Sequence, residues 1–226
     1  MIFCAGQRCE LGQILTCDLS ATGIGFETTK AFAQAGVAII AILARSQDAM
    51  TAAKKEIEAS FPSTKIVTFA ASITDHEQVN KIVKDVGTID ILMLNAATIH
   101  APSPVLGVDG AKMEELFRVN VFGPTNLIKA FLALPSRSPE TERTVIFTST
   151  AGIHVPSPGS GAYNASKIAM TSIMGSLQRE LAEQRVRSFS FHPAVAFTPL
   201  ARDILGFTAD AFPYDSGQAL WDRVGE

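Results

Sequence analysis

The sequence predicts an α/β fold in which a doubly wound parallel sheet forms a single domain, and three observations lead to this prediction. Short apolar runs recur along the chain without alternation of polar and apolar residues, as in strands that are buried on both faces. Amphipathic helical patterns separate these runs. No internal repeat, charge block or low-complexity linker divides the chain, so we assign residues 1–226 to one domain.

Six apolar runs are interpreted as buried strands: residues 14–16, 38–43, 66–70, 91–94, 145–148 and 189–191. Strands that alternate with helices imply right-handed crossovers and helices on both faces of the sheet. A ligand of such a sheet lies beyond the carboxyl ends of its strands. The residues that end each run are therefore the first candidates for a functional site.

Three helices are predicted from apolar residues spaced three and four apart. The clearest pattern follows a Thr74-x-x-Glu77 sequence, which is interpreted as a capping box. The three stripes consist of Val79, Ile82, Val83 and Val86; of Met50, Ala53 and Ile57; and of Ala165, Ala169, Ile173 and Leu177.

Composition excludes several classes of protein. Hydrophobic residues make up 47% of the chain and charged residues 18%, which argues against disorder, and a net charge of -3 offers no field that would gather nucleic acid. The most apolar later run, residues 37–44, is about half the length of a membrane span. Neither a targeting segment nor a transmembrane segment is predicted.

The cysteines and histidines predict no metal site. Cys4, Cys9 and Cys17 lack His or Cys partners at metal-ligand spacing, which favours a reducing, cytoplasmic setting. The histidines are scattered along the chain, at His76, His100, His154 and His192.

A glycine motif follows the first predicted strand. Gly23 and Gly25 flank Ile24 at the start of a helix, where free N–H groups and the positive end of the helix dipole favour a phosphate. Glycines without Cβ atoms would let the backbone approach a pyrophosphate. A simple turn is the alternative interpretation.

Two further strand ends favour a dinucleotide. Arg45 follows the second strand, and a guanidinium there matches a ribose 2′-phosphate, which favours NADP(H) while NAD(H) stays possible. Asn95 and Ala96 follow the fourth strand, where small residues would let a cofactor lie close and the amide could hydrogen-bond the backbone. Arg45 could instead be a solvated helix-start residue, and Asn95 a turn former.

Tyr163 and Lys167 are the strongest candidates for catalysis. They lie four residues apart on a predicted helix and so share one face. A nearby ammonium would lower the pKa of the phenol from about 10 toward working pH, which creates a general acid or base. A surface pair is the alternative.

Ser149 and Asn120 add polar groups to this pair. Ser149 ends the fifth predicted strand and can donate to a substrate oxygen while Tyr163 delivers the proton. Asn120 lies within a long predicted helix, where an Asn is intrinsically unfavourable and needs a specific partner. An ordinary strand-end serine and a buried hydrogen-bonding asparagine are the alternatives.

Taken in order, these motifs resemble the short-chain dehydrogenase/reductase family over roughly residues 10–200. The resemblance implies a Rossmann-type fold and an oxidoreductase that transfers a hydride between NADP(H) and a ketone, aldehyde or secondary alcohol. It implies that Tyr163 donates or accepts the proton, that Lys167 holds the nicotinamide ribose and lowers the pKa of Tyr163, that Ser149 orients the carbonyl, and that Asn120 supports a proton relay. Val195 and Thr198 resemble the positions that contact the nicotinamide carboxamide, and family members assemble as homodimers or homotetramers.

Several residues depart from the family pattern. Cys17 or Leu19 stands where the glycine loop has its first glycine, Ser72 replaces a common Asp near the adenine, and the C-terminal substrate region, residues 199–226, is short. These departures favour an alternative: a non-catalytic or weakly active dinucleotide-binding or interaction protein on the same scaffold. A Rossmann-like methyltransferase would leave Ser149, Tyr163 and Lys167 unexplained.

Overall fold

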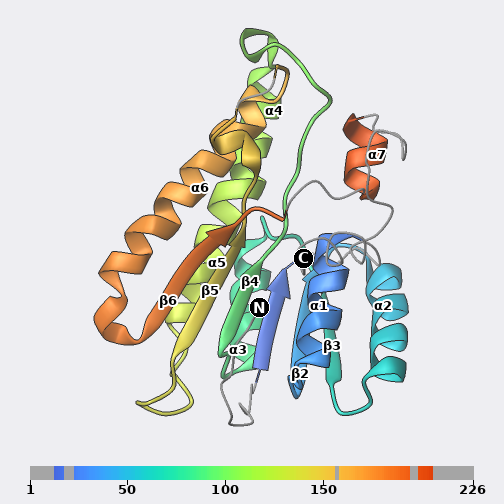
Figure 1. The fold of residues 1–226 in the computed structure, drawn as a ribbon, viewed down its shortest axis with the longest axis vertical. Coiled ribbons are helices and arrows are strands. Elements are labelled where there is room, and N and C mark those ends of the chain that lie inside the picture. The colour runs from blue at the N-terminus through green and yellow to red at the C-terminus, as the bar shows by residue number, and fades with distance from the viewer. Residues whose placement is uncertain (1–12, 18–22, 156–157, 194–197, 206–226) are drawn as a thin grey trace, which may run out of the picture.

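A six-stranded parallel sheet lies at the centre of the computed structural model, which describes residues 13–17, 23–155, 158–193 and 198–205 (Figure 1). The strand order is β3-β2-β1-β4-β5-β6, and every neighbouring pair is parallel. The strands are β1 (Gln13–Cys17), β2 (Ile39–Ala44), β3 (Lys65–Ala70), β4 (Ile91–Leu94), β5 (Arg143–Thr148) and β6 (Val186–Phe191). This confirms the predicted doubly wound sheet.

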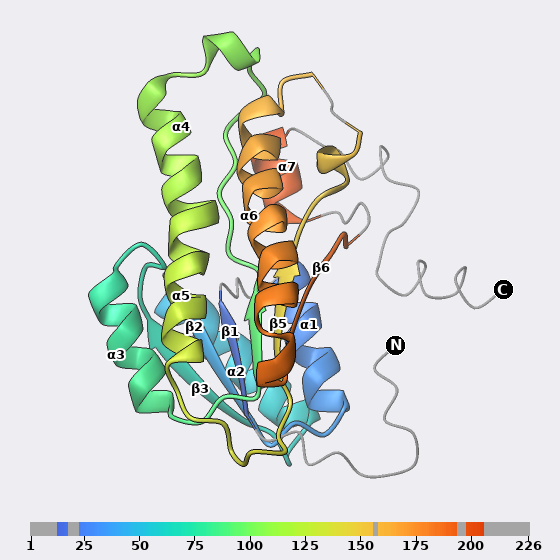
Figure 2. The ribbon, with the colours of Figure 1, turned by 90° about the vertical axis from the view of Figure 1, so that its left-hand side faces the viewer.

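Helices cover both faces of the sheet. Figure 2 shows α3 (His76–Val86), α5 (Gly123–Leu132) and α6 (Gly161–Glu180) in front of it, with α1 (Ile24–Gln34) and α2 (Gln47–Ser60) on the far face. The helix α4 (Gly110–Phe117) continues α5 beyond the carboxyl ends of the strands, where the short α7 (Pro199–Leu205) also lies (Figure 1). Single turns are η1 (Val105–Gly107), η3 (Ala151–Ile153) and η4 (Ala182–Gln184). None of the described helices is long and apolar enough to cross a membrane.

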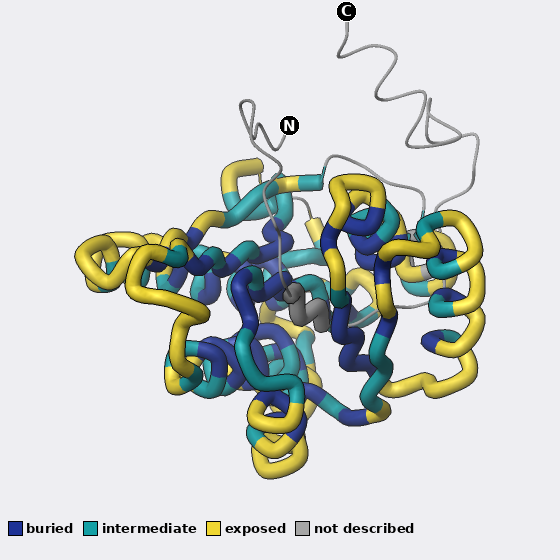
Figure 3. The backbone as a smooth tube through the Cα atoms, turned by 90° about the horizontal axis from the view of Figure 1, so that it is seen from below, coloured by how far each residue is buried: buried dark blue, intermediate teal, exposed yellow. Residues whose placement is uncertain are grey.

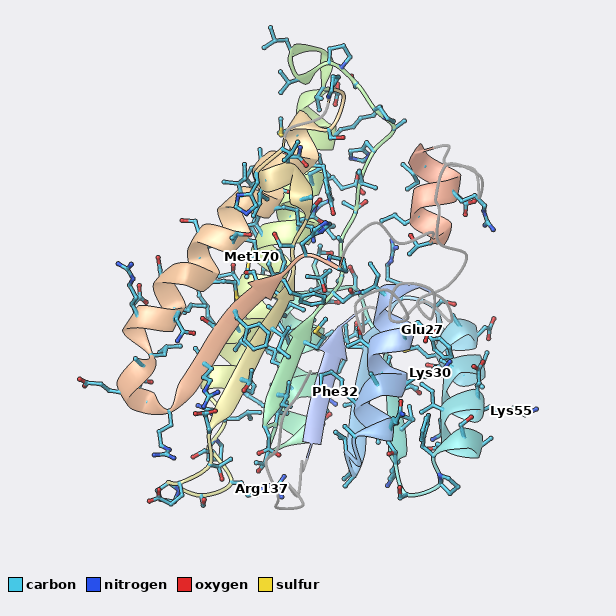
Figure 4. All side chains as sticks on the ribbon, viewed as in Figure 1. Glu27, Lys30, Phe32, Lys55, Arg137 and Met170 are labelled. Carbon is cyan, nitrogen blue, oxygen red and sulfur yellow. The ribbon has the colours of Figure 1, made fainter. Side chains whose placement is uncertain are left out.

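The core consists of two hydrophobic layers, one on each side of the sheet. Alternate residues of β2 show the division, because Ala41 and Leu43 pack with α3, α5 and α6 while Ile40 and Ile42 pack with α1 and α2. Figure 3 shows the buried positions gathered between the helices and the exposed ones on their outer sides. Phe32 on α1 and Met170 on α6 mark the two layers in Figure 4.

β6 differs from the prediction of strands buried on both faces. It is the last described strand of the sheet, and its residues alternate: Val186 and Ser188 are buried while Arg187 and Phe189 are exposed. Its buried side faces α6, because the Ser188 hydroxyl donates to the carbonyl of Met174 at 2.7 Å. Period-2 alternation of this kind is typical of a strand that is covered on one face only.

Two helix predictions need correction. The predicted capping box is wrong, because Asp75 rather than Thr74 caps α3, accepting from the N–H of Gln78 at 3.0 Å. Thr74 instead shares a hydrogen bond with Ser72, 2.7 Å apart. The predicted stripe of α6 is rotated from the buried face. Ala165, Ala169, Ile173 and Leu177 are half-buried, whereas the fully buried residues are Ala162, Asn164, Ser166, Lys167, Met170 and Met174.

The long helix predicted around Asn120 is confirmed, with one irregularity. Residues Arg118–Phe122 form a π-helical turn, η2, between α4 and α5, and the N–H of Gly123 bonds the carbonyl of Arg118 five residues back. Such turns are rare and frequently mark functional sites. Here the turn contains Asn120, which is fully buried.

Candidate active site

Tyr163 and Lys167 meet at the carboxyl end of β5. Both lie in the first two turns of α6, and the ammonium of Lys167 donates to the carbonyl of Thr148 at 2.9 Å. The same nitrogen lies 4.7 Å from the ring centre of Phe147 and 5.7 Å from that of Tyr163. A strand end and a helix face therefore hold the pair together.

Burial controls the protonation of this pair. It raises the pKa of Tyr163 to about 12 and lowers the pKa of Lys167 to about 7, because both charged forms lose hydration. This differs from the expectation that Lys167 lowers the pKa of the phenol. Burial therefore outweighs any effect of Lys167 on the pKa of Tyr163.

Ser149 lies directly after β5 and is 6% exposed. Its N–H donates to the carbonyl of Phe191 at 2.8 Å, which extends the pairing of β5 with β6 by one residue. Its hydroxyl lies 3.0 Å from the hydroxyl of Thr171 on α6. The backbone and the side chain of Ser149 are thus both fixed.

The buried side-chain amide of Asn120 forms hydrogen bonds with two neighbouring segments. Its Nδ2 donates to the carbonyl of Thr98 at 2.9 Å, and its Oδ1 accepts from the N–H of the same residue at 2.8 Å. Nδ2 also donates to Ser166 Oγ at 2.9 Å, and that hydroxyl donates to the carbonyl of Tyr163 at 2.7 Å. Asn120 therefore connects the loop after β4 to the helix of the catalytic pair.

A hollow beside this network lies over the ends of β2, β3 and β4. It encloses about 470 Å³, part of it open to solvent. It is lined by Leu43, Ala44, Arg45, Ala71, Ser72, Ile73, Ala96, Ala97, Thr98, Glu115 and Val119. Small apolar residues form much of its lining, and Arg45 is exposed at it.

Asn95 joins this hollow to the catalytic pair. Its Oδ1 accepts from the hydroxyl of Thr148 at 3.0 Å, and the carbonyl of Thr148 is the partner of Lys167. The structure thus brings Arg45 to the carboxyl end of β2 and Asn95 and Ala96 to that of β4, the two strands on either side of β1.

The start of α1 can hold a phosphate. Gly23 caps this helix with φ 88° and ψ -169°, a conformation open essentially only to glycine, and it has no side chain to occupy the first N–H groups. Gly25 in the first turn is buried, and Ile24 begins the helix. These residues and the hollow fit a dinucleotide, whose pyrophosphate the N–H groups of the helix start can bind.

Other predicted residues are less fully placed. Val195 and Leu19 lie outside the described residues, as does the glycine loop at 18–22. Thr198 precedes α7, and its carbonyl accepts from the N–H of Arg202 at 2.9 Å. Among the described residues, no group of three His, Cys, Asp or Glu side chains could hold a metal ion.

Sequence reasoning missed several polar residues of the site. Thr98, Thr148 and Ser166 each bond a predicted site residue, and the position of Thr148 beside Ser149 was the available signal. Glu115 lines the hollow, and its carboxylate lies 3.4 Å from Nε2 of His100. No local sequence pattern predicts this contact.

Several known proteins resemble this chain in sequence. Residues 20–206 match the short chain dehydrogenase family. A short chain dehydrogenase/reductase of Aspergillus aculeatus is 40% identical over 178 residues, covering 79% of this chain and 62% of the relative. Another from Claviceps purpurea is 36% identical over 203 residues, covering 89% and 65%. The chain thus spans less than two thirds of the length of these two relatives.

Solved structures share the fold. A 3-ketoacyl-(acyl-carrier-protein) reductase from Brucella melitensis, complexed with NADH, has a TM-score of 0.78 and 24% identity, covering 87% of this chain and 80% of its own. An alcohol dehydrogenase from Thermococcus sibiricus, complexed with 5-hydroxy-NADP, has a TM-score of 0.70 and 22% identity, covering 80% and 75%.

Proposed function

Because the chain belongs to the short chain dehydrogenase family, whose members are oxidoreductases, we propose that it transfers a hydride between NADP(H) and a ketone, aldehyde or secondary alcohol. The observation that carries this proposal is the meeting of Tyr163, Lys167 and Ser149 at one strand end, with Asn120 beneath them. A phenol, an amine and a hydroxyl held at one strand end are the groups that proton transfer to a carbonyl oxygen requires.

Tyr163 acts as the general acid in reduction. Its pKa of about 12 keeps the phenol protonated at neutral pH, so it can deliver a proton to a carbonyl oxygen. Ser149 donates a hydrogen bond to the same oxygen, which shares the negative charge that develops there. The nicotinamide, when bound, supplies the hydride. Alcohol oxidation is the reverse step, in which the phenolate of Tyr163 accepts the proton of the alcohol.

The cofactor is held along the strand ends. Gly23, Ile24 and Gly25 take the pyrophosphate, Asn95 and Ala96 border the adenosine half, and Lys167 and Thr198 hold the nicotinamide half, together with Val195. Arg45 is exposed at the hollow and can meet a 2′-phosphate bidentately. NADP(H) is therefore preferred over NAD(H).

A titration of the purified protein with NADPH and NADH tests this assignment. We expect wild type to prefer NADPH and Arg45→Ala to lose most of that preference while keeping its affinity for NADH. An unchanged preference would remove Arg45 from the cofactor site. NADPH binding without oxidation of NADPH across a broad carbonyl panel would favour the non-catalytic alternative.

We also propose a homodimer or homotetramer and a substrate region within residues 199–226. The helices that carry Asn120 and Tyr163 expose Phe122 and Ile168, which are 54% and 49% exposed and would be covered in such an assembly. Light scattering coupled to gel filtration measures the mass in solution. A monomer at micromolar concentration would contradict the proposed assembly.

A further inference from the structure

We propose that Thr171 is a positioning residue that orients the Ser149 hydroxyl toward the substrate oxygen. The inference rests on the proposed function, because it takes Ser149 as the donor to that oxygen. Thr171 follows Tyr163 by eight residues on α6, one turn beyond Lys167. Its Oγ1 lies 3.0 Å from Ser149 Oγ, a normal hydroxyl–hydroxyl hydrogen bond.

The other threonines of the described helices indicate which of the two hydroxyls, that of Thr171 or that of Ser149, donates. Thr28, Thr29, Thr51 and Thr125 each donate to the carbonyl four residues back, at 2.7–3.0 Å. Thr171 shows no such bond to Lys167 in the described part of the chain, and its hydroxyl contacts Ser149 instead. Because no carbonyl of the described helix residues accepts the hydrogen of Thr171, we take Ser149 Oγ as its acceptor.

This direction leaves the hydrogen of Ser149 available. A hydroxyl can donate once and accept twice, so Ser149 can accept from Thr171 while it donates to a substrate oxygen. Hydrogen bonds in such a chain polarise one another, which strengthens the terminal donor. The N–H of Ser149 is bound to the carbonyl of Phe191, which fixes the backbone, and the contact with Thr171 orients the side-chain hydroxyl.

Ser190 provides a matched control. It lies two residues after Ser188 on β6 and therefore faces α6 as well, and its buried hydroxyl has no partner among the described residues. Ser190→Ala removes a buried hydroxyl from the same layer without touching the Ser149–Thr171 pair. A general effect of removing a buried hydroxyl from this layer would appear in Ser190→Ala as well as in a variant of Thr171.

The first test measures turnover. Thr171→Val keeps the shape of the side chain but removes the hydroxyl, and we expect kcat to fall about five- to tenfold with the KM for NADPH unchanged. Thr171→Ser and Ser190→Ala should stay within about twofold of wild type. In a Ser149→Ala background, Thr171→Val should have no further effect. An equal loss in that background, or no loss in wild type, would overturn the proposal.

The second test needs no turnover. In S149C the thiolate can only accept hydrogen bonds, so a donating Thr171 lowers the pKa of that thiol. The pKa of the thiol at position 149 is measured from the thiolate absorbance, with wild type as the blank. We expect this pKa to be about one unit higher in S149C/T171V than in S149C. In S149C/T171S and S149C/S190A it should equal that of S149C. Lys167 and Tyr163 are common to all these variants.

Together, the two tests distinguish a failure of the proposed role of Thr171 from a failure of the proposed oxidoreductase function. A shifted titration in a protein that reduces no carbonyl would support the Thr171 assignment and contradict the proposed function. An active enzyme with an identical titration in all four variants would leave the function intact and overturn the role of Thr171.

Discussion

Asn120 pairs its side-chain amide with both polar groups of the Thr98 backbone, at 2.8 and 2.9 Å. The pairing holds a loop that has no regular structure and that lines the cofactor hollow. An amide in this geometry does for the loop what a neighbouring strand would do, since it supplies one donor and one acceptor to the same residue.

Removal of this amide should cost both stability and cofactor affinity. We expect Asn120→Ala to lower the free energy of unfolding by about 1–3 kcal/mol, because the partly buried polar groups of the Thr98 backbone lose their partner. The affinity for NADPH should fall as well. Urea denaturation and calorimetry measure the two effects. Asn126→Ala is the control, because Asn126 bonds Asn80 outside the hollow and should leave NADPH affinity unchanged.

Gly23→Ala should prevent cofactor binding. A Cβ atom at φ 88° and ψ -169° is strained by about 1–3 kcal/mol, so the start of α1 would have to move. Gly175→Ala is the matched control, because Gly175 lies inside α6 and an added Cβ would meet no atom within 4 Å. It should stabilise the protein by about 0.5–1 kcal/mol with unchanged NADPH affinity. Equal affinities in both variants would exclude a phosphate at Gly23.

The two directions of the reaction should differ in their dependence on pH. Reduction needs the protonated phenol of Tyr163, whose pKa is about 12, so its rate should not fall through loss of this proton up to about pH 10. Oxidation needs the phenolate of Tyr163, so the kcat/KM for alcohol oxidation should rise about tenfold per pH unit up to about pH 10. Tyr163→Phe should abolish both. A plateau of the oxidation rate near pH 7 would show that the pKa of Tyr163 is far lower than stated.

Lys167 should make stability depend on pH. The unfolded chain keeps this amine protonated to about pH 10.4, whereas the folded chain releases the proton near pH 7. The unfolded state binds more protons between these values, so the folded state gains stability as pH rises. Relative to Lys167→Met, wild type should gain about 2 kcal/mol between pH 7.5 and pH 9.5, measured by urea denaturation.

Lys55→Met is the control for this measurement. Lys55 is exposed on α2 (Figure 4), and its replacement should shift stability equally at both pH values. A constant difference between wild type and Lys167→Met would contradict a lowered pKa for Lys167.

The strands could be predicted because each buried strand can be recognised from its own apolar sequence. β2 and β4 are surrounded by other strands and helices, so their sequences are apolar without interruption and can be recognised alone. β6 is covered on one face, so the exposed Arg187 interrupts its apolar sequence and the prediction found only its last three residues. The placement of Tyr163 and Lys167 on one helix was equally predictable, since it depends only on helix periodicity.

Other features depend on contacts between distant segments. Asp75 and Thr74 are both good helix caps, and only the contact of Thr74 with Ser72 explains why Asp75 is used. The burial that raises the pKa of Tyr163 comes from the whole surrounding fold. The contact of Ser149 with Thr171 joins residues 22 positions apart, and a sequence pattern gives no reason to select that threonine from its neighbours.

The π-helical turn at residues 118–122 makes this segment intolerant of changes in length. The turn holds one residue more than a regular α-helical turn, so the loss of one residue would close it to an α-helix and shift Asn120 relative to its hydrogen-bond partners. Asn120 would then face away from Thr98 or from Ser166. An engineered or natural deletion here should therefore disable the site while most of the core stays packed, whereas point substitutions at the exposed Arg118 should be tolerated.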